Sequence, residues 1–175
     1  MTLIRRLHVG DGLRSEALYS GCETYRYLLR RDWGAGGRRL LFVMLNPSTA
    51  DEMRNDPTVA RCEARARRLG YDGFAVANLF AFRATLPADL RRAADPIGPD
   101  NDRILDEAAA DAETILCAWG VHGARSGRGL AVFARFHAQG HALWHLGLTK
   151  HGLPRHPLYC PNTTELQVWD RPKNP

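Results

Sequence analysis

Apolar and polar residues occur in alternating blocks along the chain, and these blocks predict strands and helices in turn. Nearly continuous apolar runs are typical of strands buried on both faces of a sheet. The four runs lie at residues 40–45, 74–82, 114–119 and 142–146. Apolar residues at helical spacing predict helices at residues 58–69, 100–111 and 126–139. Crossovers of this length permit parallel strand pairing, so the pattern predicts an α/β fold with helices on both faces.

Two further patterns complete the expected domain. Residues 25–33 read as a strand, and a glycine-rich turn separates them from the first apolar run. This spacing predicts an antiparallel hairpin. We expect three layers around a central, mainly parallel four-stranded sheet, with the hairpin at its N-terminal side. The expected boundaries are an irregular arm with at most one short strand over residues 1–23, one α/β domain over 24–165 and a tail over 166–175.

The helix expected at residues 58–69 has clear end signals. Asp56 and Pro57 are typical of an N-cap and a first helical position, and Gly70 ends the segment. A stripe of arginines at helical spacing runs along one side of it, and we expect a solvated face there. The stripe is Arg61, Arg65 and Arg68.

Composition adds few limits to this picture. The 175 residues suit one domain, and a hydrophobic share of 45% is that of a globular protein. No apolar run approaches the roughly 18 residues of a membrane helix, and the N-terminus lacks a signal-peptide pattern. We therefore expect a cytoplasmic protein with no membrane partner. The net charge of +5 permits nucleic-acid binding without requiring it. Four widely spaced cysteines predict free, mostly buried thiols.

Candidate chemistry lies where the predicted strands end, because an open parallel sheet binds ligands beyond the carboxyl ends of its strands. Four segments follow those ends and should converge on one cleft. The candidates in them are Asn46, Pro47, Ser48, Asp51, Asn78, Arg83, Trp119, Lys150, His156 and Tyr159. We expect Asn46, Asp51, Asn78, Lys150 and His156 in particular to meet there.

Each candidate also has an ordinary structural interpretation. Asn46, Asp51 and Asp56 are residue types that cap turns and helices. The others are equally typical of a buried amide, of plain loop residues or of packing groups: Asn78, His156, Lys150, Trp119 and Tyr159. The sequence leaves both interpretations open.

Metal and dinucleotide motifs are missing from the sequence. It contains neither a Gly-x-Gly-x-x-Gly pattern nor a phosphate-binding Gly-Lys-Ser/Thr loop. Four histidines crowd the C-terminal quarter: His141, His145, His151 and His156. No pair of them shares a predicted helix at metal-binding spacing, so we expect no metal at these histidines.

Several motifs occur together in a known order. They are Leu-Asn-Pro-Ser-Thr-Ala-Asp at 45–51, Asn-Asp-Pro-Thr at 55–58, Asn-Leu-Phe-Ala-Phe-Arg-Ala-Thr at 78–85, Thr-Lys at 149–150 and His-Pro-Leu-Tyr at 156–159. This order resembles a bacterial and phage family known only as domain of unknown function 1643, over roughly residues 20–165. The family name supplies no function.

A more distant resemblance does suggest a function. Leu45 to Ser48 resembles the Gly-Ile-Asn-Pro-Gly catalytic loop of one branch of the uracil-DNA glycosylase superfamily. Val76 to Arg83 resembles the strand end whose asparagine reads the uracil edge, and His156-Pro157 resembles the superfamily's last motif. The resemblance implies hydrolysis of an N-glycosidic bond in DNA or in a nucleotide, without cofactor.

Within that resemblance the candidates take roles. Asn46 and His156, together with Asp51, are the candidate catalytic residues, with Asn46 orienting water and His156 stabilising the departing base. Asn78 would select the base. The remaining candidate residues would bind substrate: Pro47, Ser48, Arg83, Trp119, Lys150 and Tyr159. Met44 and Ser48 replace the glycines of the superfamily loop, which leaves open the alternative of a nucleobase- or nucleic-acid-binding module without turnover.

Overall fold

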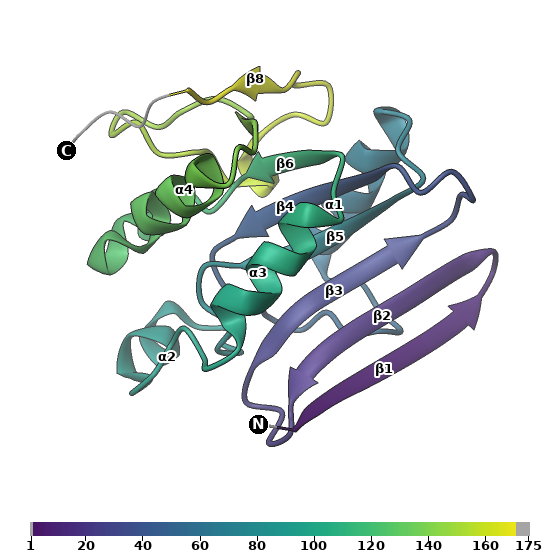
Figure 1. The fold of residues 1–175 in the computed structure, drawn as a ribbon, viewed down its shortest axis with the longest axis horizontal. Helices are drawn as coiled ribbons and strands as arrows, with labels where there is room; N and C mark the ends of the chain where they lie inside the picture. Colours follow the sequence, from purple (N-terminus) through teal and green to yellow (C-terminus); the bar gives the residue numbers. More distant parts are fainter. Residues whose placement is uncertain (1, 171–175) are drawn as a thin grey trace.

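The computed structural model describes residues 2–170 as an eight-stranded mixed sheet with helices on both faces (Figure 1). The strands are β1 Leu3–Gly10, β2 Leu13–Ser20, β3 Arg26–Asp32, β4 Arg39–Met44, β5 Gly73–Asn78, β6 Thr114–Cys117, β7 Leu143–His145 and β8 Gln167–Val168. The α-helices are α1 Pro57–Arg68, α2 Pro87–Arg92, α3 Asn101–Ala110 and α4 Arg128–Ala138. Short 3₁₀ helices are η1 Val121–Gly127 and η2 Pro157–Tyr159. The α/β class is confirmed.

The strand order is β1-β2-β3-β5-β4-β6-β7-β8. Neighbours from β5 to β7 pair in parallel, whereas β1, β2 and β3 join antiparallel on one side and β8 joins antiparallel on the other. The sheet is thus larger than the expected four strands with one hairpin. Strand β8 forms within the expected tail, and helix α2 is an element that the apolar pattern did not predict.

The predicted hairpin between residues 25–33 and the first apolar run is wrong, because β5 lies between β3 and β4. The glycine-rich loop that joins β3 to β4 does not make a tight turn. It wraps around Asp72, the residue before β5. The backbone carbonyl of Asp72 accepts from the amides of Trp33 and Gly34, and its carboxylate accepts from the amide of Arg38. A Cβ on Gly34 would lie 2.3 Å from the Asp72 carboxylate, so the glycines serve this close approach.

The expectation of an irregular arm at the N-terminus is also wrong for the described residues. Strands β1 and β2 form a hairpin whose two-residue loop is Asp11-Gly12, with φ of 52° and 72°. Asp-Gly between two strands is a strong hairpin signal, since both positions need positive φ. The Asp-Gly pair in the sequence therefore predicts this hairpin better than the polar composition of residues 1–23 does.

Alternate residues of the central strands face two separate cores. Leu41, Val43 and their partners pack under α3 and α4, whereas Leu40, Phe42 and Met44 pack under α1. Figure 1 shows α3 and α4 together on the near face of the sheet. Both faces of the central strands are therefore buried, as their continuous apolar runs predicted.

Helix α1 begins as predicted, with Pro57 in its first turn and the Asp56 carboxylate accepting from the Val59 amide at 2.8 Å. The prediction of a solvated arginine face is wrong for Arg65, the middle residue of the stripe. Arg65 is fully buried and donates to the carbonyls of Pro161, Asn162 and Thr164, so it holds the C-terminal loop onto the helix.

The cysteines are all free thiols, three of them buried, as predicted. Over residues 2–170, no helix combines the length and the apolar composition needed to span a bilayer.

Candidate functional site

A cavity of about 580 Å³ opens at the carboxyl ends of the parallel strands. Residues that follow β4, β5, β6 and β7 all line it, and Arg26 of β3 adds a fifth segment. The candidate residues among the lining are Asn46, Ser48, Trp119, His156 and Tyr159. The four loops thus reach one cavity although they are far apart in sequence.

Asn46 lies two residues after the end of β4, and the two polar atoms of its side chain are bonded differently. Its side-chain Nδ2 donates to the carbonyls of Pro47 and Ala84, at 2.9 and 2.7 Å. The amide of Ala84 in turn donates to the carbonyl of Pro47 at 3.0 Å. The amide nitrogen therefore ties the loops after β4 and β5 together. The Oδ1 atom accepts no hydrogen bond from residues 2–170 and is an acceptor available to the cavity that Asn46 lines.

His156 lines the same cavity from the loop after β7, and the backbone fixes its tautomer. Its Nδ1 accepts from the Leu158 amide at 3.3 Å, so the neutral ring carries its proton on Nε2. Burial lowers the pKa of His156, and the nearby Asp56 charge opposes that shift. At neutral pH the residue is therefore an uncharged hydrogen-bond donor.

The carboxylate at the cavity is that of Asp56 and not that of Asp51. Asp51 is outside the lining; its Oδ1 accepts from the amides of Met53 and Arg54 and closes a turn. Burial opposes the change, yet these hydrogen bonds keep the pKa of Asp51 below its ordinary value. Asp56 lines the cavity and uses only Oδ1 to cap α1, which leaves Oδ2 without a partner among the described residues.

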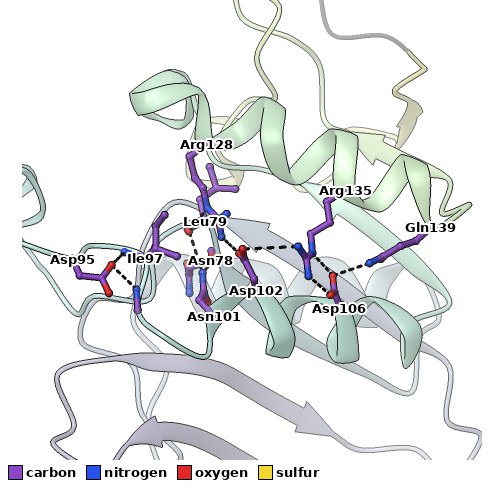
Figure 2. A network of polar contacts seen from close by, with 11 residues as sticks. Asn78, Leu79, Asp95, Ile97, Asn101, Asp102, Asp106, Arg128, Arg135 and Gln139 are labelled. Atoms are coloured by element: carbon purple, nitrogen blue, oxygen red, sulfur yellow. Dashed lines mark hydrogen bonds and ion pairs between the residues drawn. The ribbon is translucent and has the colours of Figure 1, made fainter. Parts of the chain in front are cut away.

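Asn78 lies at the end of β5, as predicted, but it is 1% exposed and does not line the cavity. It pairs in register with Met44, which does line it. Figure 2 shows Asn78 beside a polar network in which Asn101 donates from Nδ2 to the carbonyls of Asn78 and Leu79. Neither polar atom of the Asn78 side chain has a partner within residues 2–170.

The remaining polar candidates lie outside the cavity lining. Lys150 is exposed; its neighbour Thr149 lines the cavity instead. Arg83 is exposed, donates to the Glu23 carbonyl and lies over the Tyr19 ring, with its guanidinium carbon 5.3 Å from the ring centre. Pro47 is buried and contributes its carbonyl to the loop tie.

The two aromatic candidates differ sharply in exposure. Trp119 is 1% exposed and packs against Trp169, with ring centres 5.5 Å apart. Gly123 and Gly129 are needed beside it, because a Cβ at either would lie within 3 Å of the indole. Tyr159 is 79% exposed at the cavity, with its ring centre 5.9 Å from that of His156. Only Tyr159 offers a free ring face for stacking.

Sequence reasoning missed Arg26 entirely. It lines the cavity, is 2% exposed and donates to the Ala50 carbonyl. Burial lowers its pKa to about 10, although Tyr19 and Asp56 oppose the shift, so it stays charged at neutral pH. Its position within a strand gave no signal, because tertiary packing alone determines that this side chain reaches the cavity.

The clustered histidines do not form a metal centre. Within the described residues, no group of three or more His, Cys, Asp or Glu side chains is arranged to hold a metal ion. His145 instead accepts from the Gly147 amide through Nδ1, at 2.8 Å.

Comparison with known proteins adds a family but no activity. The chain matches no curated protein and no solved structure. A family model matches residues 26–158, from β3 to η2, and so includes every strand end that borders the cavity. Because this match covers more than half of the chain, the protein belongs to the family described as "Protein of unknown function (DUF1643)".

Proposed function

We propose that the cavity binds a nucleobase and that the protein hydrolyses its N-glycosidic bond, in DNA or in a nucleotide. One observation carries the proposal: Asn46 and His156, which come from opposite ends of the domain's sequence, line the same cavity. A free amide acceptor and a neutral donor around one space are groups that this reaction can use. The proposal includes a fold of the uracil-DNA glycosylase type, supported by the position of the Leu45–Ser48 loop directly after β4.

His156 would act on the leaving base. When the bond between C1′ and the base breaks, the electron pair goes to the base and leaves an oxocarbenium-like sugar. The Nε2–H of His156 would donate to the base anion. A donor fixed in advance stabilises developing charge without reorganisation.

Asn46 and Asp56 would act on water. The free Oδ1 of Asn46 and the free Oδ2 of Asp56 are the acceptors that would orient a water toward C1′. The water oxygen bonds to C1′, and its proton passes to the Asp56 carboxylate and then to the base anion. The products are the free base and the sugar hydroxyl, so atoms and charge balance. Asp56 replaces Asp51 in the catalytic set.

Base selection no longer rests on Asn78, since its amide is buried outside the lining. The hydroxyls of Ser48, Thr58 and Thr85 line the cavity and are the candidates for reading the base edge. The exposed ring of Tyr159 at the same cavity would stack on a base or its neighbour, as aromatic groups do in proteins that take a base out of a strand.

The test is an alkali-cleavage assay on oligonucleotides that carry uracil, hypoxanthine, xanthine or hypermodified pyrimidines. Strand breaks that disappear in Asn46→Ala, with unchanged circular dichroism, support the enzyme. His151→Ala is the matched control, because His151 is exposed on the same loop as His156 and does not line the cavity. Absence of cleavage on every substrate, with no base or nucleotide bound, would refute the proposal.

A second function has its own support. The Nδ2 of Asn46 joins two loops, so Asn46 has a complete structural reason to be present. A binding module that keeps the cavity without turnover needs nothing more. Binding of a base or nucleotide without release of free base would favour this module. A steep loss of affinity between about 50 and 200 mM salt would identify its ligand as nucleic acid.

A further inference from the structure

Five arginines are buried among the described residues, and four of them donate two or three side-chain hydrogen bonds each. Arg31, Arg39 and Arg65 each donate three hydrogen bonds, and Arg128 donates two. Their acceptors are backbone carbonyls, carboxylates and one amide oxygen. This is the usual condition for a buried charge, which is costly to remove from water without partners.

Arg26 has the fewest partners of these five. It donates one hydrogen bond, from Nη1 to the carbonyl of Ala50. Its Nε is buried and has no partner among residues 2–170, as is also true of the Nε of Arg65. Like Arg31 and Arg65, it forms no ion pair with a carboxylate of those residues, although Asp56 lines the same cavity. Arg26 is nevertheless 2% exposed.

The cavity is the open space from which a further partner could reach Arg26. The side chain lines that space, and a guanidinium offers a planar fork of donors that matches the two oxygens of a carboxylate or a phosphate. A buried polar group without partners in a folded protein calls for an explanation, and a bound anion is the simplest one.

We propose that the ligand of this cavity carries an anionic oxygen group, and that Arg26 binds it. The inference rests on the proposed nucleobase function and defines its substrate class. Either a phosphate of the nucleotide or a carboxylate on the base would supply the group. A neutral nucleoside would leave Arg26 unpaired and bind more weakly.

The experiment measures dissociation constants by calorimetry at about 0.15 M salt, where surface charges are screened. The probes are 2′-deoxyuridine, deoxyinosine and the common deoxynucleosides, the 5′-monophosphate of each, and 5-carboxy-2′-deoxyuridine. We expect at least one anionic probe to bind about 10- to 100-fold more tightly than its neutral counterpart, the range of a charged hydrogen bond. Preference for a monophosphate identifies the nucleotide phosphate, and preference for the carboxylated base identifies a base carboxylate.

Three variants test whether Arg26 causes the preference. Arg26→Met should abolish it, and Arg26→Lys should keep part of it, because the charge remains and the fork is lost. Arg31→Met is the matched control, since Arg31 is on the same strand, is equally buried and does not line the cavity. It should keep the full preference. Circular dichroism and thermal unfolding establish the folded fraction of each variant.

The outcomes separate the two proposals. Equal binding of neutral and anionic probes, or a preference that survives Arg26→Met, overturns the anionic substrate while leaving the nucleobase function standing. No binding of any base, nucleoside or nucleotide overturns both.

Discussion

Two groups of polar residues at the strand ends differ in how completely they are bonded. The bracing network consists of Asn101, Asp102, Asp106, Arg128 and Arg135, and joins α3 to α4 and to the end of β5 (Figure 2). The cavity cluster consists of Arg26, Asn46, Asp56 and His156. Every side chain of the bracing network makes at least two polar contacts within the protein, and its one buried atom without a partner, Oδ1 of Asn101, does not line the cavity.

Each member of the cavity cluster uses one part of its side chain and leaves another free. The atoms without a hydrogen-bond partner among the described residues are one carboxylate oxygen of Asp56, one ring nitrogen of His156, the side-chain oxygen of Asn46 and most of the N–H donors of Arg26. The used parts position the side chains, and the free parts line one space. The difference teaches that an unbonded polar atom is available to a ligand only where its side chain also lines the cavity, since the unbonded atoms of Asn78 and Asn101 are sealed in the interior.

The largest expected effect is on catalysis. His156→Ala should lower the rate of N-glycosidic cleavage about 10²- to 10³-fold, the usual loss for one electrostatic donor. Single-turnover assays on the best oligonucleotide substrate measure it. His151→Ala, on the same loop, should keep the full rate, and an equal loss in both would show that loop disruption and not the Nε2 donor is responsible.

A smaller effect, on stability alone, is expected in the bracing network. Asn101→Ala removes both donors to the buried carbonyls of Asn78 and Leu79, at a cost of about 2–4 kcal/mol in the free energy of unfolding. Urea unfolding measures this. Base binding per folded molecule should stay unchanged, and a lost affinity would break the distinction between the two groups. Arg103→Ala, an exposed change on the same helix, should leave stability nearly unaltered.

The pH dependence of stability should be smaller again. Burial lowers the pKa of His156, and also that of His145, below the unfolded value of about 6.5. The unfolded state therefore binds more protons, so stability is full above about pH 6.5 and falls as the pH drops below it. One histidine contributes at most about 1.4 kcal/mol per pH unit. Urea unfolding between pH 7 and 5 measures this effect. The free energy of unfolding should fall less steeply with decreasing pH in His156→Gln than in the unchanged protein, and an equal slope in both would contradict the prediction.

The smallest effect is expected at Lys150. The residue is exposed and outside the cavity lining, so Lys150→Ala should change the free energy of unfolding by less than about 0.5 kcal/mol. Cleavage and nucleotide binding should stay within twofold of the unchanged protein, about the scatter of such assays. A large loss of cleavage or of nucleotide binding would show that Lys150 is a functional residue and belongs to the cavity cluster.

Local patterns account for the parts of the fold that were predicted. The four apolar runs became β4 to β7 because strands covered on both faces admit few polar residues. Asp56 and Pro57 began α1 because cap and first-turn preferences act within a few residues. The same patterns identified the loops that would surround a ligand, and Asn46 and His156 within them.

Strand order and side-chain partners lay beyond such patterns. Strand β5 pairs between β3 and β4, and beside it Asp72 bonds to a loop more than 30 residues earlier in the chain. The loop between β4 and α1 brings Asp56 to the cavity and uses Asp51 to close a turn. No local pattern in the sequence shows which of these two aspartates lines the cavity.

The sequence by itself determined that this protein has an α/β fold with polar loops at the strand ends, since periodicity and end signals are properties of neighbouring residues. Only the tertiary structure decided that Asn78 is sealed in the interior and that Arg26, at the start of an ordinary strand sequence, reaches the cavity with its charge unpaired. The physical reason is that burial and hydrogen bonding are set by residues distant in the chain, which no local pattern records.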